Sequence, residues 1–115
     1  MKKSLTKEER IKKSSDFKRI FSKGKMKSCR GARLYWIVNE HGYNRFAVTL
    51  TKGFGNAVTR NKINRWIREI YRELKGSINN NGYDFLFYFY PGEYSFTERK
   101  AQVHLLINKS GVTHG

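Results

Sequence analysis

Residues 56–75, NAVTRNKINRWIREIYRELK, contain the pattern that decides how this chain folds. Apolar side chains recur there with helical spacing, at Ile63, Trp66, Ile67, Ile70, Tyr71 and Leu74. Side chains three and four positions apart share one face of an α-helix, so the stripe predicts a helix packed against a core. Asn56 precedes the stripe and can accept a hydrogen bond from the first free N–H groups, which places the start of the helix there.

Three strands are predicted around this helix. Residues 33–38 (RLYWIV) are mostly aromatic and β-branched, and residues 45–51 alternate between apolar and polar side chains. Residues 83–90 (YDFLFYFY) carry large side chains at nearly every position. Each pattern is typical of a strand, and the first two are expected to pair as an antiparallel hairpin across the turn at 39–44.

Two shorter helices are predicted near the ends of the chain. The first begins at residues 14–16 (SSD) and carries an apolar face, and Gly24 in a left-handed conformation is expected to end it. The second begins with the capping box Ser95-x-x-Glu98 and continues through Val103, Leu106 and Ile107.

The order of these elements, α-β-β-α-β-α, predicts an α+β fold, a single two-layer sandwich with helices on one face of a sheet and the other face partly open. A chain of 115 residues is the length of one domain, residues 1–115. Within it, residues 1–13 are interpreted as a basic arm that orders on a partner, and residues 111–115 as a loose tail.

The charge of the chain indicates a polyanionic partner. Lysine and arginine number 24 against 9 acids, a formal net charge of +15. Nucleic acid is favoured over a membrane, because no stretch approaches the roughly 18 apolar residues of a spanning helix. The N-terminus has no apolar segment typical of a signal peptide, and the single Cys29 suits a reducing compartment, so a cytoplasmic location is expected.

The face of the 56–75 helix opposite its apolar stripe is rich in arginine. Packing against a core does not require arginine at these positions, and arginines one turn apart repel one another. Guanidinium groups bind phosphates through two parallel hydrogen bonds, and only Glu69 and Glu73 supply acids on this helix. An ordinary solvated face is the alternative, but the excess of basic over acidic side chains favours RNA binding.

Residues 55–69, GNAVTRNKINRWIRE, closely resemble the signature of the bacterial ribonuclease P protein, Gly-Asn-Ala-Val followed by an Arg-Asn-Arg-x-x-Arg helix. Residues 10–21 are similar to the first helix of that family, and Leu34-Tyr35 to its first strand, so the resemblance covers about residues 8–107. The chain departs from the family at Lys62, where arginine is frequent, and at Gly53 and Asn64, where a basic residue is usual.

The resemblance implies an accessory role in an endoribonuclease reaction. In that family the catalytic RNA hydrolyses the 5′ leader of precursor tRNA with bound Mg²⁺, so no catalytic side chain, protein-bound cofactor or small-molecule substrate is expected. The partners would be the ribonuclease P catalytic RNA and precursor tRNA. The fold would contain a left-handed β-α-β crossover. The signature residues expected to contact the catalytic RNA are Asn56, Arg60, Asn61, Lys62, Asn64, Arg65 and Arg68.

A second surface is implied for the single-stranded leader, in a cleft between the first helix and the open sheet face. Its expected residues are Phe17, Phe21, Arg33, Tyr35, Thr49 and Thr51. Unpaired bases stack on aromatic faces with little sequence preference, which suits leaders that differ between tRNAs. From pattern alone, Phe17 and Phe21 are equally well explained as core. The arm residues Lys7, Arg10, Lys12 and Lys13 are expected to touch phosphates, unless they form an ordinary solvated run.

Three other functions compete with this one. A general RNA-binding or ribosomal protein of similar fold has the same charge and aromatic content. A protein-only nuclease needs clustered carboxylates for metal ions, and neither the nine acids, isolated Asp84 and Glu93 among them, nor the three histidines form such a set. A helix-turn-helix is disfavoured because strand residues 45–51 stand where its first helix would be.

Overall fold

The computed structural model describes residues 9–78 and 81–112. The elements follow the order α1 (Ser14–Lys23), β1 (Lys25–Cys29), β2 (Ala32–Val38), β3 (Arg45–Leu50), α2 (Ala57–Leu74), a short 3₁₀ helix (Lys75–Ser77), β4 (Tyr83–Phe89) and α3 (Phe96–Ser110). The α+β class is confirmed, and every predicted helix and strand is present. One strand, β1, was not predicted, because its side chains are mostly exposed and show no apolar alternation.

The sheet has the strand order β1-β2-β4-β3. Strand β4 pairs antiparallel with β2 and parallel with β3, so β3, α2 and β4 form a β-α-β crossover. The predicted hairpin between residues 33–38 and 45–51 is therefore wrong. Strand β4 takes the place between them because Phe85, Leu86 and Phe87 are fully buried, and only a central strand buries large side chains on both faces.

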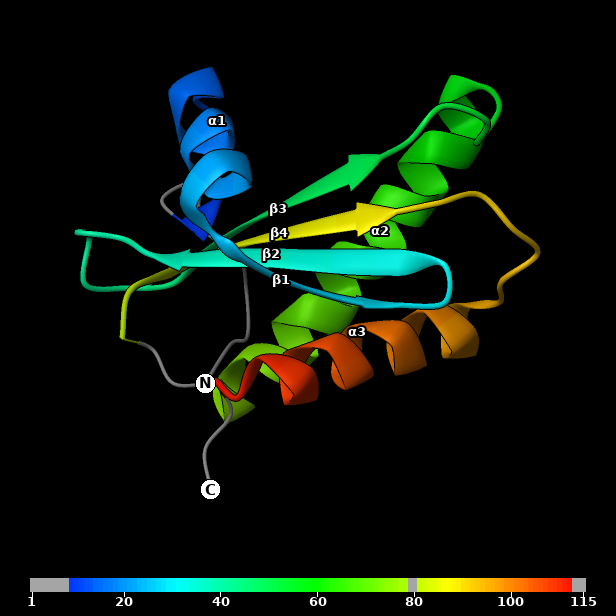
Figure 1. Cartoon of the computed structure of the whole chain (residues 1–115). Helices are drawn as coiled ribbons and strands as arrows, with labels where there is room; N and C mark the ends of the chain where they lie inside the picture. Colours follow the sequence, from blue (N-terminus) through cyan, green and yellow to red (C-terminus); the bar gives the residue numbers. More distant parts are fainter. Residues whose placement is uncertain (1–8, 79–80, 113–115) are drawn as a thin grey trace.

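The helices lie on both faces of this sheet. Helices α2 and α3 cover one face and α1 lies across the other (Figure 1). The main core fills the first face, where Phe85, Phe87 and Phe89 of β4 pack with the buried stripe of α2. A second, smaller core lies under α1 and consists of Ile11, Ile20, Ala47 and Leu86. The expectation that all helices share one face fails for α1, whose Ile20 packs against the opposite side of β4.

Local sequence signals fix most of the helix ends. Asn56 accepts a hydrogen bond from the Thr59 N–H at 3.1 Å, as predicted. Ser95 and Glu98 form the predicted capping box. Gly24 differs from the prediction. Its backbone, with a φ of −75°, is extended rather than left-handed. A Cβ at Gly24 would collide with the carbonyl oxygen of Ile20, so close approach, not backbone handedness, requires glycine there.

Parts of the predicted arm and tail are fixed by the fold. Arg10 forms a parallel bridge with Phe46, and the Ile11 N–H donates to the Phe46 carbonyl at 3.0 Å, so this part of the arm is already ordered against β3. Val112 is buried in the main core, so the tail is not loose at this position. Residues 1–8, including Lys7, and residues 113–115 lie outside the described residues. No helix in the described ranges is long and apolar enough to cross a membrane.

Candidate nucleic-acid interface

Helix α2 has the two faces that its sequence predicted. Ile63, Ile67, Ile70, Tyr71 and Leu74 are buried against the sheet. The opposite face exposes the side chains of Asn61, Lys62, Arg65 and Arg68 to solvent. A helix that buries one stripe of side chains in the core leaves its opposite face exposed to a partner.

The exposed arginines of α2 are not neutralised by the protein's own acids. Within residues 9–78 and 81–112, Arg65 and Arg68 form neither an ion pair nor a hydrogen bond through their side chains. Glu73, near the end of the same helix, pairs with Lys100 of α3 at 3.6 Å. The guanidinium groups of Arg65 and Arg68 are therefore free to bind a phosphate.

Three other predicted contacts of α2 have partners within the protein. Arg60 donates hydrogen bonds to the carbonyl oxygens of Leu50 at 3.1 Å and Thr51 at 3.3 Å, so it anchors the end of β3. The Asn56 side-chain oxygen is used by the helix cap. Lys62 lies with its Nζ 5.2 Å from the centre of the Trp66 ring. The contact of Arg60 with β3 is tertiary, and no sequence signal on α2 could have shown it.

A pocket of about 290 Å³ lies where the chain before α1 meets β3 and α2. Its lining includes apolar side chains of the chain before α1, of α1 and of β3, together with three cationic and two amide side chains. The predicted site residues that it brings together are Arg10, Lys12, Phe17, Asn61, Asn64 and Arg68. Residues predicted separately for the arm, the cleft and the signature helix therefore share one concave surface.

An aromatic patch lies on the sheet face next to α1, and we define it as Phe21, Tyr35, Tyr88 and Tyr90. The ring of Phe21 is 4.9 Å from that of Tyr35 and 6.2 Å from that of Tyr88, both edge-on. Tyr88 and Tyr90 are 5.5 Å apart. These two tyrosines were not predicted as site residues, because β4 carries large side chains on both faces and its sequence alone does not say which face is open.

Polar side chains border the aromatic patch. Arg33 and Thr49 are the register partners of Tyr88 on the two neighbouring strands. The Arg33 guanidinium donates to the Tyr35 hydroxyl at 3.4 Å and lies 5.5 Å from the centre of the Tyr90 ring. The hydrogen bond to Tyr35 raises the pKa of Arg33 above its ordinary value, so this cation stays charged beside the rings. Thr51 follows directly after the last residue of β3.

The two phenylalanines of α1 differ in their surroundings. Phe17 is half-buried and packs against the second core, although it also lines the pocket. Phe21, one turn later, leaves 44% of its surface exposed. The interpretation as core therefore suits Phe17, and the interpretation as a surface group suits Phe21.

In the part of the chain that the structure describes, no three His, Cys, Asp or Glu side chains cluster closely enough to hold a metal ion. Asp84, one of the two isolated acids, is fully buried and hydrogen-bonded to Arg19, Asn39 and Arg45. Burial raises the pKa of the Cys29 thiol, which disfavours the thiolate, the reactive form of a cysteine.

Comparison with known proteins points to one family. The Ribonuclease P family model matches residues 5–111. A ribonuclease P protein component from Petrotoga mobilis is 42% identical over 84 residues, 73% of this chain and 70% of the relative. One from Clostridium botulinum (strain Loch Maree) is 37% identical over 81 residues, 70% of this chain and 73% of the relative.

Solved structures show the same fold. The Staphylococcus aureus RNase P protein superposes with a TM-score of 0.84 at 29% identity, over 92% of this chain and 98% of that one. The Thermotoga maritima RNase P protein gives a TM-score of 0.75 at 28% identity, over 88% and 96%. Because sequence and structure agree over nearly the whole length, the chain belongs to the family of bacterial ribonuclease P proteins.

Proposed function

We propose that this chain binds the catalytic RNA of ribonuclease P through the exposed face of α2 and the single-stranded 5′ leader of precursor tRNA through the aromatic patch. Family membership makes it a protein subunit of a ribonuclease complex. The two surfaces give that subunit two tasks, holding the RNA that performs the hydrolysis and holding the strand to be removed.

The observation that carries the proposal is the state of Arg65 and Arg68. Both side chains are exposed, and no acid among the described residues pairs with them. A folded RNA presents phosphates at regular spacing, and guanidinium groups one helical turn apart can bind successive phosphates. A chain with a net charge of +15 also attracts such a polyanion from a distance.

The leader surface is supported by Phe21, Tyr35 and Tyr88. Partly exposed aromatic rings beside Arg33 suit unpaired bases, which stack on rings while a cation holds their phosphates. This mode needs no base-specific hydrogen bonds, so it accepts leaders of different sequence. Mg²⁺ would act with the catalytic RNA, and the protein would supply binding and orientation. We place this activity in the cytoplasm, where precursor tRNA is processed.

Reconstitution tests the proposal. The chain is added to the catalytic RNA at a Mg²⁺ concentration at which the RNA alone cleaves precursor tRNA poorly, and 5′ leader release is measured. We expect the protein to restore cleavage and to bind the catalytic RNA more tightly than an equal mass of ribosomal RNA. Equal affinity for the two RNAs without restored cleavage would instead indicate a general RNA-binding protein.

A further inference from the structure

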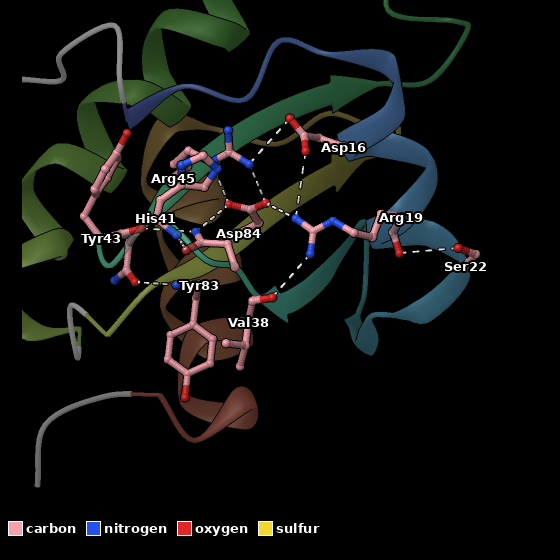
Figure 2. A network of polar contacts seen from close by, with 11 residues as sticks. Asp16, Arg19, Ser22, Val38, His41, Tyr43, Arg45, Tyr83 and Asp84 are labelled. Carbon is pink, nitrogen blue, oxygen red and sulfur yellow. Dashed lines mark hydrogen bonds and ion pairs between the residues drawn. The ribbon is translucent and has the colours of Figure 1, made fainter.

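A buried carboxylate on the α1 side of the sheet has a role that neither RNA surface explains. Asp84 is the second residue of β4, and its side chain has no exposed surface. Its Oδ1 accepts hydrogen bonds from Asn39 Nδ2 at 2.8 Å and Arg45 Nε at 2.9 Å. Its Oδ2 accepts from Arg45 Nη2 and Arg19 Nη2, both at 2.7 Å (Figure 2). Both oxygens are fully used, so Asp84 cannot itself contact RNA.

The cluster around Asp84 balances its own charge. Asp16 of α1 lies 3.5 Å from Arg45 and 3.9 Å from Arg19, so two carboxylates face two guanidinium groups. In a protein this basic, an arginine tied to acids adds little attraction for RNA. Arg19 and Arg45 are therefore placed to hold elements together, unlike the free arginines of α2.

The elements that this cluster holds form one wall of the aromatic patch. Arg19 and Asp16 belong to α1, whereas Asp84 and Arg45 lie side by side on β4 and β3. Arg19 also donates to the Val38 carbonyl at the end of β2, at 3.3 Å. Helix α1 has only ten residues, a length that is not stable in isolation. Its angle to the sheet therefore depends on this cluster and on the small second core.

The strand register shows how the cluster and the aromatic patch are connected. Across the face under α1, successive rows of β2, β4 and β3 are Ile37, Asp84 and Arg45, then Tyr35, Leu86 and Ala47, then Arg33, Tyr88 and Thr49. Helix α1 is fixed over the first two rows through Arg19 and Ile20. Phe21 then reaches the rings of Tyr35 and Tyr88 in the second and third rows. A change in the tilt of α1 would move Phe21 away from Tyr88.

We propose that Asp84 is a positioning residue for the aromatic patch, because it fixes α1 at the angle that holds Phe21 against Tyr35 and Tyr88. Asp84 thereby sets the affinity for the single-stranded leader without touching it. This inference rests on the leader-binding role proposed above, and it assigns a part of that role to a buried acid.

Asp84→Asn tests the proposal by the sign of its effect. The substitution keeps the shape of the side chain but removes a negative charge, so simple electrostatics predicts tighter binding of every RNA. Positioning predicts the opposite for the leader. In complexes reconstituted with the catalytic RNA, the ratio of mature-tRNA to precursor-tRNA Kd measures the contribution of the leader. We expect this ratio to fall about tenfold, the equivalent of one stacked base, with affinity for the catalytic RNA undiminished.

Asp84→Asn leaves two arginines without their buried partner, and such a change can prevent folding. Arg19→Gln is the second variant, because Arg19 is 34% exposed and its loss removes the hydrogen bonds from α1 to Asp84 and Val38. Asp84 keeps its bonds to Arg45 and Asn39, and the contact of Asp16 with Arg45 remains. Lys18→Gln is its matched control, since Lys18 is exposed on the same helix and carries the same charge. Loss of a phosphate contact would lower the slope of log affinity against log salt by about 0.7–0.9. Loss of positioning leaves that slope unchanged.

We expect Arg19→Gln to reduce the leader contribution more than Lys18→Gln does, at an unchanged salt slope. A folded Asp84→Asn protein with the leader contribution of the wild type would overturn the inference. Equal effects of Arg19→Gln and Lys18→Gln would overturn it as well. If the wild-type complex binds precursor and mature tRNA equally, the leader-binding role itself is wrong, and the positioning role of Asp84 is rejected with it.

Discussion

The two faces of the sheet are built from alternate residues of the same strand, yet they do different things. On the α2 and α3 face, β4 presents Phe85, Phe87 and Phe89, all without exposed surface. On the α1 face it presents a buried carboxylate, Leu86 and a half-exposed tyrosine. The first face is a continuous apolar core, and the second combines a small core, a charge cluster and open rings. Stability is therefore concentrated on one side of β4, and the surface proposed for the leader lies on the other.

The sharpest test of this division is Phe87→Ala. Phe87 is fully buried, with its ring centre 6.2 Å from that of Tyr71, so its loss leaves a cavity between the sheet and α2. We expect a loss of about 3–5 kcal/mol in the free energy of unfolding, measured by urea denaturation. Phe21→Ala is the matched aromatic truncation on the other face and should lose less than about 1 kcal/mol. Similar losses in the two variants would contradict the division.

A large effect on binding with little effect on stability is expected for the exposed face of α2. Arg65→Ala and Arg68→Ala should each weaken assembly with the catalytic RNA about tenfold, the value of one charge-assisted hydrogen bond. Their urea midpoints should stay near that of the wild type, since neither side chain has a partner among the described residues. Filter binding at several salt concentrations measures the affinity, and the salt slope should fall by about 0.7–0.9 for each lost contact.

Arg60→Ala sharpens the same comparison within α2. Its guanidinium binds the Leu50 and Thr51 carbonyls, so we expect this variant to lose stability by about 1–3 kcal/mol through the unsatisfied carbonyls. Its salt slope should remain that of the wild type. A reduced slope with unchanged urea midpoint would show that Arg60 contacts RNA in the complex, as the family resemblance implied.

Phe21→Ala should act on the substrate rather than on assembly. Loss of the ring removes one side of the aromatic patch, so precursor tRNA should bind up to about tenfold more weakly while mature tRNA is unaffected. Competition binding with the reconstituted complex measures both. An equal loss of affinity for the two tRNAs, or a loss of thermal stability alone, would show that Phe21 is a core residue and not a leader contact.

Features set by neighbouring residues could be predicted from the sequence, whereas features set by distant segments could not. The start of α2 at Asn56 and the capping box of α3 depend on neighbours within one turn, and both were predicted. Strand pairing depends on distant segments, so the sequence suggested a hairpin where β4 intervenes. Strand β1 is a polar edge strand whose lysines give no apolar period.

The residues of the candidate site also divide into those that local sequence predicts and those that depend on distant segments. The exposed arginines of α2 follow from helical period alone, because a residue opposite a buried stripe must face outward. Tyr88 was not predicted, because β4 carries large side chains on both faces. Only the position of α1 shows which face of β4 stays open. The partners of Asp84 lie 39 to 65 positions away in sequence. No local pattern carries that information, and the family resemblance did not include it.

The smallest expected effect concerns Glu98 at the start of α3, on the α2 and α3 side of the sheet. The Glu98 side chain accepts a hydrogen bond from the Ser95 N–H at 2.8 Å, and this bond lowers the pKa of Glu98 from its ordinary value of 4.5. A lowered pKa means that the charged form stabilises the fold above the ordinary value, and that this contribution is lost as pH falls through the folded value. Glu98→Gln should therefore be slightly less stable than the wild type at pH 7 and equally stable in acid.

Urea denaturation of both proteins across this pH range checks the expectation, with Glu93→Gln as the control for loss of a charge in the preceding loop. Because Glu98 belongs to α3, on the opposite side of the sheet from α1, its substitution should leave the leader contribution of the reconstituted complex unchanged. A change in that contribution would show that α3 also influences the aromatic patch. The separation of stability from leader binding between the two sides of β4 would then not hold.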